Sequence, residues 1–169
     1  MSNPTTAPHQ LLSLIWKDLP PTAHFLDLGC GAGHDSLFMA QNGFEVTAVD
    51  NSTPVIEALD SQAKIIGAEK NLQTVCADVI DFNIEQDRFD VILLSNVLQF
   101  LTTEERGRLI KNVKSKVKIN GYVLVSGFTE DNPSFKRKNE TIKSHLKSQE
   151  LLNMFRESKV IYYYEGMIL

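Results

Sequence analysis

Short runs of β-branched and aromatic residues alternate with helical patterns along most of the chain. These runs predict strands at residues 25–28, 46–49, 72–75, 89–94, 122–125 and 160–164. Apolar residues recur at helical spacing over 36–41 and 54–66, and Thr102 with Glu105 predicts a capping box at the start of a further helix. The alternation predicts an α/β fold, in which a doubly wound, Rossmann-like and mostly parallel sheet carries helices on both faces.

The chain length limits the number of domains. With 169 residues, the chain is long enough for one hydrophobic core and too short for two independent ones. We therefore expect a single domain over residues 1–169, with an N-terminal helical region at 1–22. The polar stretch 129–147 is expected to form a mobile loop over the ligand-binding edge of the sheet.

Charge and hydropathy exclude some classes of partner and some cellular locations. The 17 Lys and Arg residues against 21 Asp and Glu residues give a net charge of −4, which argues against nucleic acid or an anionic membrane as the main partner. The apolar runs are too short to span a membrane, and no basic residue precedes Lys17 as a signal peptide would require. Cys30 and Cys76 cannot build a disulfide framework, and together these features predict a cytoplasmic protein.

The most specific motif is a glycine-rich turn after the first predicted strand. Gly29, Gly31 and Gly33 stand at alternate positions, where a backbone without Cβ atoms can turn sharply and let a ligand approach. A dinucleotide fingerprint would require glycine or alanine in place of His34, so a dinucleotide is disfavoured. Asp27 would repel a pyrophosphate beside this turn, but it suits the cationic amino-acid tail of a ligand such as S-adenosylmethionine.

Two further acidic residues stand at the ends of the next strands. Asp50 ends the second predicted strand about 20 residues after the glycine turn, where a carboxylate can accept hydrogen bonds from both ribose hydroxyls. Asp78 follows the third strand, where it can accept the exocyclic amine of an adenine, and Val79 and Asn51 would flank the ring. Because parallel strands end at one edge of a sheet, the two acids and the turn together predict a nucleoside site.

The stretch 24–128 resembles the class I S-adenosylmethionine-dependent methyltransferases. The resemblance is carried by the glycine turn, Val49-Asp50, the Asp78 segment and residues 89–100, while 33–40 and 163–166 resemble the tellurite-resistance and thiopurine methyltransferase group. It implies S-adenosyl-L-methionine as the cofactor, with Ser95 beside the methionine and the reacting methyl. The cofactor-binding residues that follow are Asp27, Gly29, Cys30, Gly31, Gly33, Asp50, Asn51, Asp78, Val79 and Ser95.

The resemblance also implies the reaction. The closer group modifies small soft-atom or thiol-like substrates, so we expect in-line transfer of the sulfonium methyl to a thiol or chalcogen oxyanion. Such a nucleophile needs little general-base help, and neither a catalytic residue nor a metal ligand is assigned. Residues 95–98 lack the prolines with which amino-methylating enzymes hold a base, and neither cysteine follows a proline, so methylation of nucleic acid is disfavoured.

Other interpretations stay open. Cys30 can be a space-filling residue of the turn, His34 a helix cap or a residue facing the ligand, Asp50 a helix cap and Asp78 a turn former. For the whole chain, the alternatives are a nucleotide-dependent enzyme, a methyltransferase for another small metabolite, and a catalytically idle cofactor-binding module that acts through a protein partner.

The C-terminal part of the sheet is expected to be incomplete. Sheets of the resembled class usually have an antiparallel seventh strand beside the fifth, and this chain ends soon after the strand predicted at 160–164. We therefore expect the final antiparallel strand to be missing, either because the chain is truncated or because the sheet is completed differently. A second copy that pairs with the open edge would form a homodimer.

Overall fold

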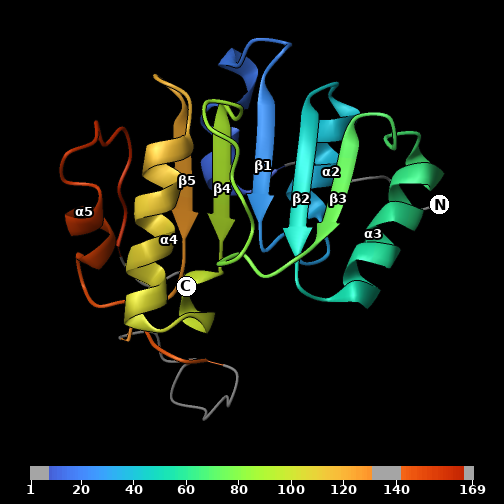
Figure 1. Ribbon diagram of the computed structural model, residues 1–169. Coiled ribbons are helices and arrows are strands. Elements are labelled where there is room, and N and C mark those ends of the chain that lie inside the picture. The colour runs from blue at the N-terminus through green and yellow to red at the C-terminus, as the bar shows by residue number, and fades with distance from the viewer. Residues whose placement is uncertain (1–7, 131–141, 166–169) are drawn as a thin grey trace.

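A single parallel sheet forms the centre of the protein. The computed structural model describes residues 8–130 and 142–165. Its strands lie in the order β3-β2-β1-β4-β5, and every pairing is parallel (Figure 1). Their bounds are β1 (His24–Leu28), β2 (Glu45–Asp50), β3 (Leu72–Cys76), β4 (Val91–Ser95) and β5 (Tyr122–Ser126). The predicted α/β class and the first five predicted strands are thereby confirmed.

Helices cover both faces of the sheet, as predicted. The helical segments are α1 (Gln10–Ser13), η1 (Trp16–Asp18), α2 (His34–Gln41), α3 (Thr53–Ile66), η2 (Leu98–Phe100), α4 (Thr103–Lys116) and α5 (Glu150–Met154). Figure 1 shows α4 in front of the sheet and α2 behind it. The placement of helices on opposite faces follows from the chain order. Helices α2 and α3 connect β1, β2 and β3, which lie on one side of the sheet's centre, whereas α4 connects β4 to β5 on the other side.

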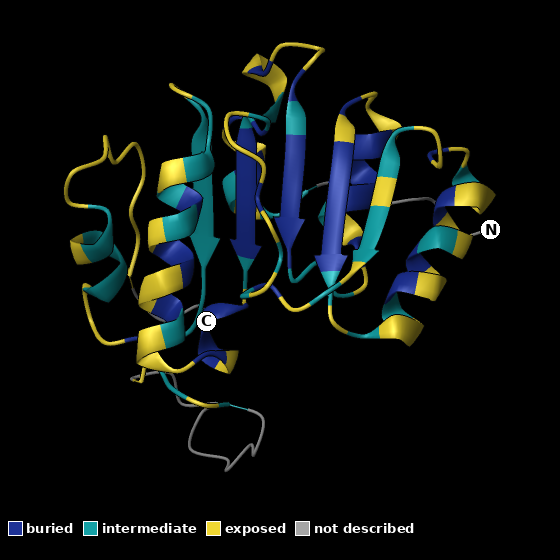
Figure 2. Cartoon of the chain, in the orientation of Figure 1, coloured by how far each residue is buried: buried dark blue, intermediate teal, exposed yellow. Residues whose placement is uncertain are grey.

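Alternate residues of each central strand supply two separate cores. In β4, Val91 and Leu93 pack with the α1 and α2 side, whereas Ile92 and Leu94 pack with α4. Strands β1, β2 and β4 are consequently buried over most of their length, and the flanking β3 and β5 are largely half-buried (Figure 2). This double burial explains why these strand sequences are nearly continuous apolar runs.

The N-terminal region at 1–22 contains two short helices within its described part. Leu12 is fully buried, and the Trp16 ring meets Phe38 of α2 edge-on at 5.1 Å between ring centroids. Trp16 therefore packs the N-terminal region against α2.

The strand predicted at 160–164 is wrong. These residues have no regular secondary structure, and the large apolar side chains from Val160 to Tyr164 are exposed. The prediction rested on β-branched and aromatic composition, which favours a strand only where a neighbouring strand offers backbone partners. Among the described residues, β5 pairs with β4 alone, so residues 160–164 do not add to the open edge of β5.

The loop predicted at 129–147 lies mostly outside the described residues, which omit 131–141. Its described ends are held firmly: Thr129 forms a parallel bridge with Leu146, whose side chain is buried in the core on the α4 side. The fully buried Arg106 of α4 donates to the carbonyl oxygens of Ser144 and His145 and pairs with Glu150. Residues 142–150 are thus anchored to α4 by a buried charge.

Within the described residues, no helix is both long enough and apolar enough to cross a membrane.

The capping box at the start of α4 gives a direct test of local stability. Thr102 Oγ1 accepts from the Glu105 amide at 3.2 Å, and the Glu105 side chain accepts from the Thr102 amide at 2.8 Å. Thr102→Ala should lower the free energy of unfolding by about 1 kcal/mol, because it removes the acceptor for an amide at the helix start. Thr103→Ala, at the adjacent exposed position, is the control and should change it by less than about 0.5 kcal/mol. Urea unfolding measures both, and equal losses would contradict the capping role.

Candidate functional site

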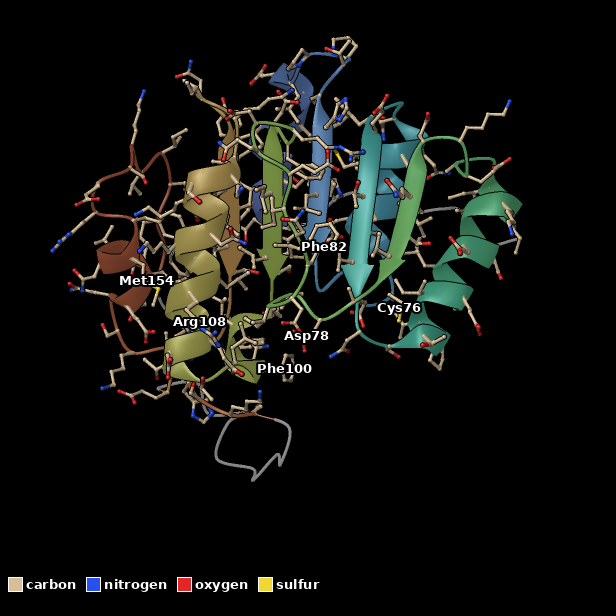
Figure 3. All side chains as sticks on the ribbon, viewed as in Figure 1. Cys76, Asp78, Phe82, Phe100, Arg108 and Met154 are labelled. Atoms are coloured by element: carbon tan, nitrogen blue, oxygen red, sulfur yellow. The ribbon has the colours of Figure 1, made fainter. Side chains whose placement is uncertain are left out.

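The carboxyl ends of the parallel strands gather the predicted site residues along one edge of the sheet. This edge lies at the bottom of Figure 1, where the arrowheads point. In Figure 3, Cys76, Asp78 and Phe100 are labelled along the same edge. Ligands of open α/β sheets bind outside the carboxyl ends of their strands, so this edge is the place to look for a site.

The glycine-rich turn is tied to the end of β2 by its backbone. The Gly29 and Cys30 amides both donate to the Val49 carbonyl, at 2.7 and 2.9 Å. The Gly31 amide donates to Asp50 Oδ2 at 2.9 Å. The loop after β1 is therefore held against the last two residues of β2, which brings Asp50 to the glycine turn as the sequence spacing predicted.

Each glycine of the turn serves a different need. All three have positive φ, and a Cβ on Gly29 would lie 2.5 Å from Val97 Cγ2, while one on Gly33 would lie 2.3 Å from Leu59 Cδ1. A Cβ on Gly31 would meet nothing within 4 Å. Gly29 and Gly33 thus allow close packing inside the protein, and Gly31 leaves the backbone open on the ligand side of the turn.

Asp50 has both of its carboxylate oxygens at the turn. Oδ1 accepts from the Ser52 amide at 3.0 Å, and Oδ2 accepts from Gly31. A carboxylate offers about four acceptor positions, so each oxygen keeps one for a ligand hydroxyl. The helix-capping interpretation of Asp50 is wrong, because the N-cap of α3 is Ser52 and Asp50 bonds the amide of that residue rather than an amide of the first helical turn.

Asp27 is buried beneath the turn. Its side chain is 3% exposed and accepts a hydrogen bond from Ser36 Oγ at 2.6 Å. Burial raises the pKa of Asp27 to about 7; the Ser36 bond opposes this rise, and the Asp35 and Asp50 carboxylates add to it. Burial likewise raises the pKa of the Cys30 thiol, with Asp27 and Asp50 contributing. Cys30 is therefore a neutral thiol within the turn, which fits the space-filling interpretation.

Asp78 and its neighbours border the site beyond β3. Asp78 is exposed, and its Oδ1 accepts from the Ile80 amide at 3.0 Å, which forms the turn that the alternative interpretation proposed. Val79 is buried in the core on the α4 side, whereas Asn51 is exposed next to Asp50. An adenine ring between these residues would meet a carboxylate on one side and an amide on the other.

Ser95 ends β4 next to the end of β5. Its Oγ lies 3.2 Å from Ser126 Oγ, and the following amide, of Asn96, donates to the Ser126 carbonyl at 3.0 Å. Asn96 has a φ of 55°, so the chain turns sharply at this point. The turn directs Val97 back against Gly29, which links the end of β4 to the glycine turn.

The structure adds three residues that the motif did not reveal: Ser36, Val97 and Ser126. Each contacts a predicted residue from a different element of the fold. Ser36 could have been suspected, because it lies on the first turn of the helix that follows the glycine turn. Within the described ranges, no group of three or more His, Cys, Asp or Glu side chains is arranged to hold a metal ion.

Comparison with known proteins shows the family of this chain. Residues 5–168 match the family model described as tellurite resistance protein TehB. A protein of Haemophilus influenzae named as a probable S-adenosyl-L-methionine-dependent methyltransferase TehB is 32% identical over 155 residues, which cover 88% of this chain and 53% of that protein. The crystal structure of TehB from the same organism superposes with a TM-score of 0.80 at 27% identity, covering 96% of this chain and 55% of that one.

A second group of relatives carries a different name. The carboxy-S-adenosyl-L-methionine synthase of Shewanella loihica is 30% identical over 114 residues, which cover 65% of this chain and 46% of the synthase. The chain therefore spans about half the length of the curated relatives that it matches.

The packing of the glycine turn predicts unequal effects of adding one methyl group. Gly33→Ala should lower the free energy of unfolding by about 2–4 kcal/mol, because the new Cβ overlaps Leu59 in a backbone conformation that already disfavours alanine. Gly31→Ala shares the positive φ but has open space around its Cβ, so it should cost only about 1 kcal/mol. Thermal and urea unfolding of the two variants test this difference. Equal destabilisation would show that Leu59 moves aside freely.

Proposed function

We propose that the chain, which belongs to the TehB tellurite resistance family, binds S-adenosyl-L-methionine and acts as a methyltransferase on a small molecule. The observation that carries the proposal is the glycine turn bonded to Asp50 at the carboxyl edge of the sheet. The printed name of the TehB relative supports this cofactor, since that protein is named as a probable S-adenosyl-L-methionine-dependent methyltransferase.

The residues at this edge fit the proposed cofactor. Gly31 leaves its side of the turn open, which gives a methionine moiety access to the backbone. Asp50 keeps acceptor positions for the ribose hydroxyls, and the exposed Asp78 has a carboxylate within reach of an adenine amine. When bound, the cofactor supplies an electrophilic methyl on its sulfonium. We also assign Asp27, Gly29, Cys30, Gly33, Asn51, Val79 and Ser95 to the proposed cofactor site.

The protein's contribution to the reaction is positioning and exclusion of water. Ser95 and Ser126 stand side by side where β4 and β5 end, and Phe100 adds an exposed aromatic ring at the same edge. An acceptor held there in line with the methyl gains from orientation alone, and a soft nucleophile needs no strong base. We therefore propose a small thiol or chalcogen oxyanion as the acceptor.

A methyl-transfer assay distinguishes the proposed enzyme from a cofactor-binding module without activity. The purified chain should transfer labelled methyl from S-adenosylmethionine to at least one of tellurite, selenite and a small aliphatic thiol. Transfer to a different small metabolite would keep the enzyme class and replace the acceptor. If S-adenosylhomocysteine binds normally and no tested acceptor is methylated, a module that acts through a protein partner becomes the better proposal.

Further proposals concern the oligomeric state, the partners and the cellular location of the protein. The outer edge of β5 offers backbone groups to a second copy of the chain, so we propose a homodimer through this edge. A proline substitution at Val123 or Val125 removes an amide that faces outward from this edge, so it should abolish the dimer. Sedimentation equilibrium of the wild type and the variant measures the change. A cytoplasmic location and the absence of a nucleic-acid partner also remain proposals.

Asp50 provides the sharpest test of the cofactor site. Asp50→Asn should weaken S-adenosylhomocysteine binding by at least about tenfold, because an amide group replaces one of two oxygens that accept backbone N–H groups and ribose hydroxyls. Glu57→Gln on the exposed face of α3 removes the same charge at a nearby position and should leave the affinity unchanged. Isothermal titration calorimetry measures both. Wild-type affinity in Asp50→Asn would mean that the site is misplaced.

A further inference from the structure

Asp27 is an acidic residue in surroundings that do not favour its charge. It lies in the middle of the sheet, paired in register with Ala48 of β2 and Leu93 of β4, and its side chain is 3% exposed. The Ser36 hydroxyl donates the one hydrogen bond recorded for it among the described residues. A buried carboxylate normally requires several donors or a cation to remain ionised.

The charged groups around Asp27 oppose its ionisation. The charges acting on it come from Asp35 at the start of α2 and from Asp50 at the end of β2, and both are negative. Cys30 on the turn is a neutral thiol. The His34 imidazole lies 3.9 Å from the Asp35 carboxylate, which also accepts from the backbone amide of His9, while the His9 imidazole accepts from the Leu11 amide.

We propose that Asp27 carries a proton in the ligand-free protein near neutral pH and releases it to solvent when a ligand with a cationic amino-acid tail binds over the glycine turn. The proposal rests on the proposed function, because S-adenosylmethionine is such a ligand. The O–H bond of the carboxyl breaks, the proton goes to the buffer, and the resulting carboxylate gains the attraction of the ammonium group. Cofactor binding is then coupled to pH through one buried group.

The direction of the effect follows from linkage. The pKa of about 7 in the free protein falls when a cation binds nearby, so the bound state holds fewer protons than the free state between the two pKa values. The affinity therefore rises with pH below 7 and levels off above it. A free-state pKa of about 7 corresponds to binding about tenfold tighter at pH 8 than at pH 6.

The experiment is calorimetric titration of S-adenosylhomocysteine into the full chain from pH 6 to 8, in phosphate and in imidazole buffer, whose ionisation enthalpies differ. The wild type should release close to one proton at pH 6 and almost none at pH 8. Asp27→Asn removes the titrating group, so its proton release and the tenfold change should both disappear. A tenfold pH dependence that persists unchanged in Asp27→Asn overturns the proposal.

A second variant keeps the test valid if Asp27→Asn does not fold. Ser36→Ala removes the hydrogen bond that favours the carboxylate, so the midpoint of the pH dependence should move upward. Binding that is equally tight at all pH values in wild type and Ser36→Ala overturns the proposal and leaves the proposed function intact. Failure of the wild type to bind S-adenosylhomocysteine at any pH overturns the proposed function itself.

Discussion

The bonding of the glycine turn to the end of β2 is the constraint on which the site depends. Three consecutive amides, from Gly29 to Gly31, donate to the Val49 carbonyl and the Asp50 carboxylate. Amides that curl inward in this way require positive φ at the glycines, and they leave little room for side chains. The glycine turn also fixes where α2 begins, because Gly33 is the N-cap of α2. It fixes where Val97 can pack as well, because Val97 lies against Gly29. The positions of β1, β2, α2 and the segment after β4 are therefore all set by one short loop.

The sequence was most informative where the fold is local. The five paired strands, the helix after Pro54 and the capping box at Thr102 follow from periodicity and from neighbouring residues, and the structure confirms them. The contact of Val97 with Gly29 depends on how separate elements pack, so no pattern along the chain could reveal it, whereas only the position of Ser36 after the glycine turn hinted at its contact with Asp27. The strand predicted at 160–164 failed for the same reason, because a strand exists only through its partner.

The two halves of the carboxyl edge differ in how they are built. The half around the glycine turn, Asp50 and Asp78 comes from segments directly joined to β1, β2 and β3, and its geometry is fixed by backbone hydrogen bonds. The half around Ser95 and Ser126 is followed by Thr129, which bridges to Leu146, and the buried Arg106 of α4 bonds directly to the same segment, 142–150. Removing one partner of such a buried ion pair costs several kcal/mol, so this second half is held by tertiary contacts to α4 as well as by backbone bonds. Its sequence is correspondingly less motif-like, and the acceptor is harder to predict than the cofactor.

The electrostatics of the edge explain why its ligand should be cationic and free of phosphate. Asp50 accepts hydrogen bonds from two backbone amides, Asp78 is exposed to water, and Asp27 avoids its charge by holding a proton near neutral pH. A phosphate placed over the same turn would meet Asp50 directly and would force Asp27 to remain protonated. A cationic tail reverses both effects, since it is attracted to Asp50 and favours the ionised form of Asp27. The glycine turn alone is compatible with either ligand, and the three acids around it decide between them.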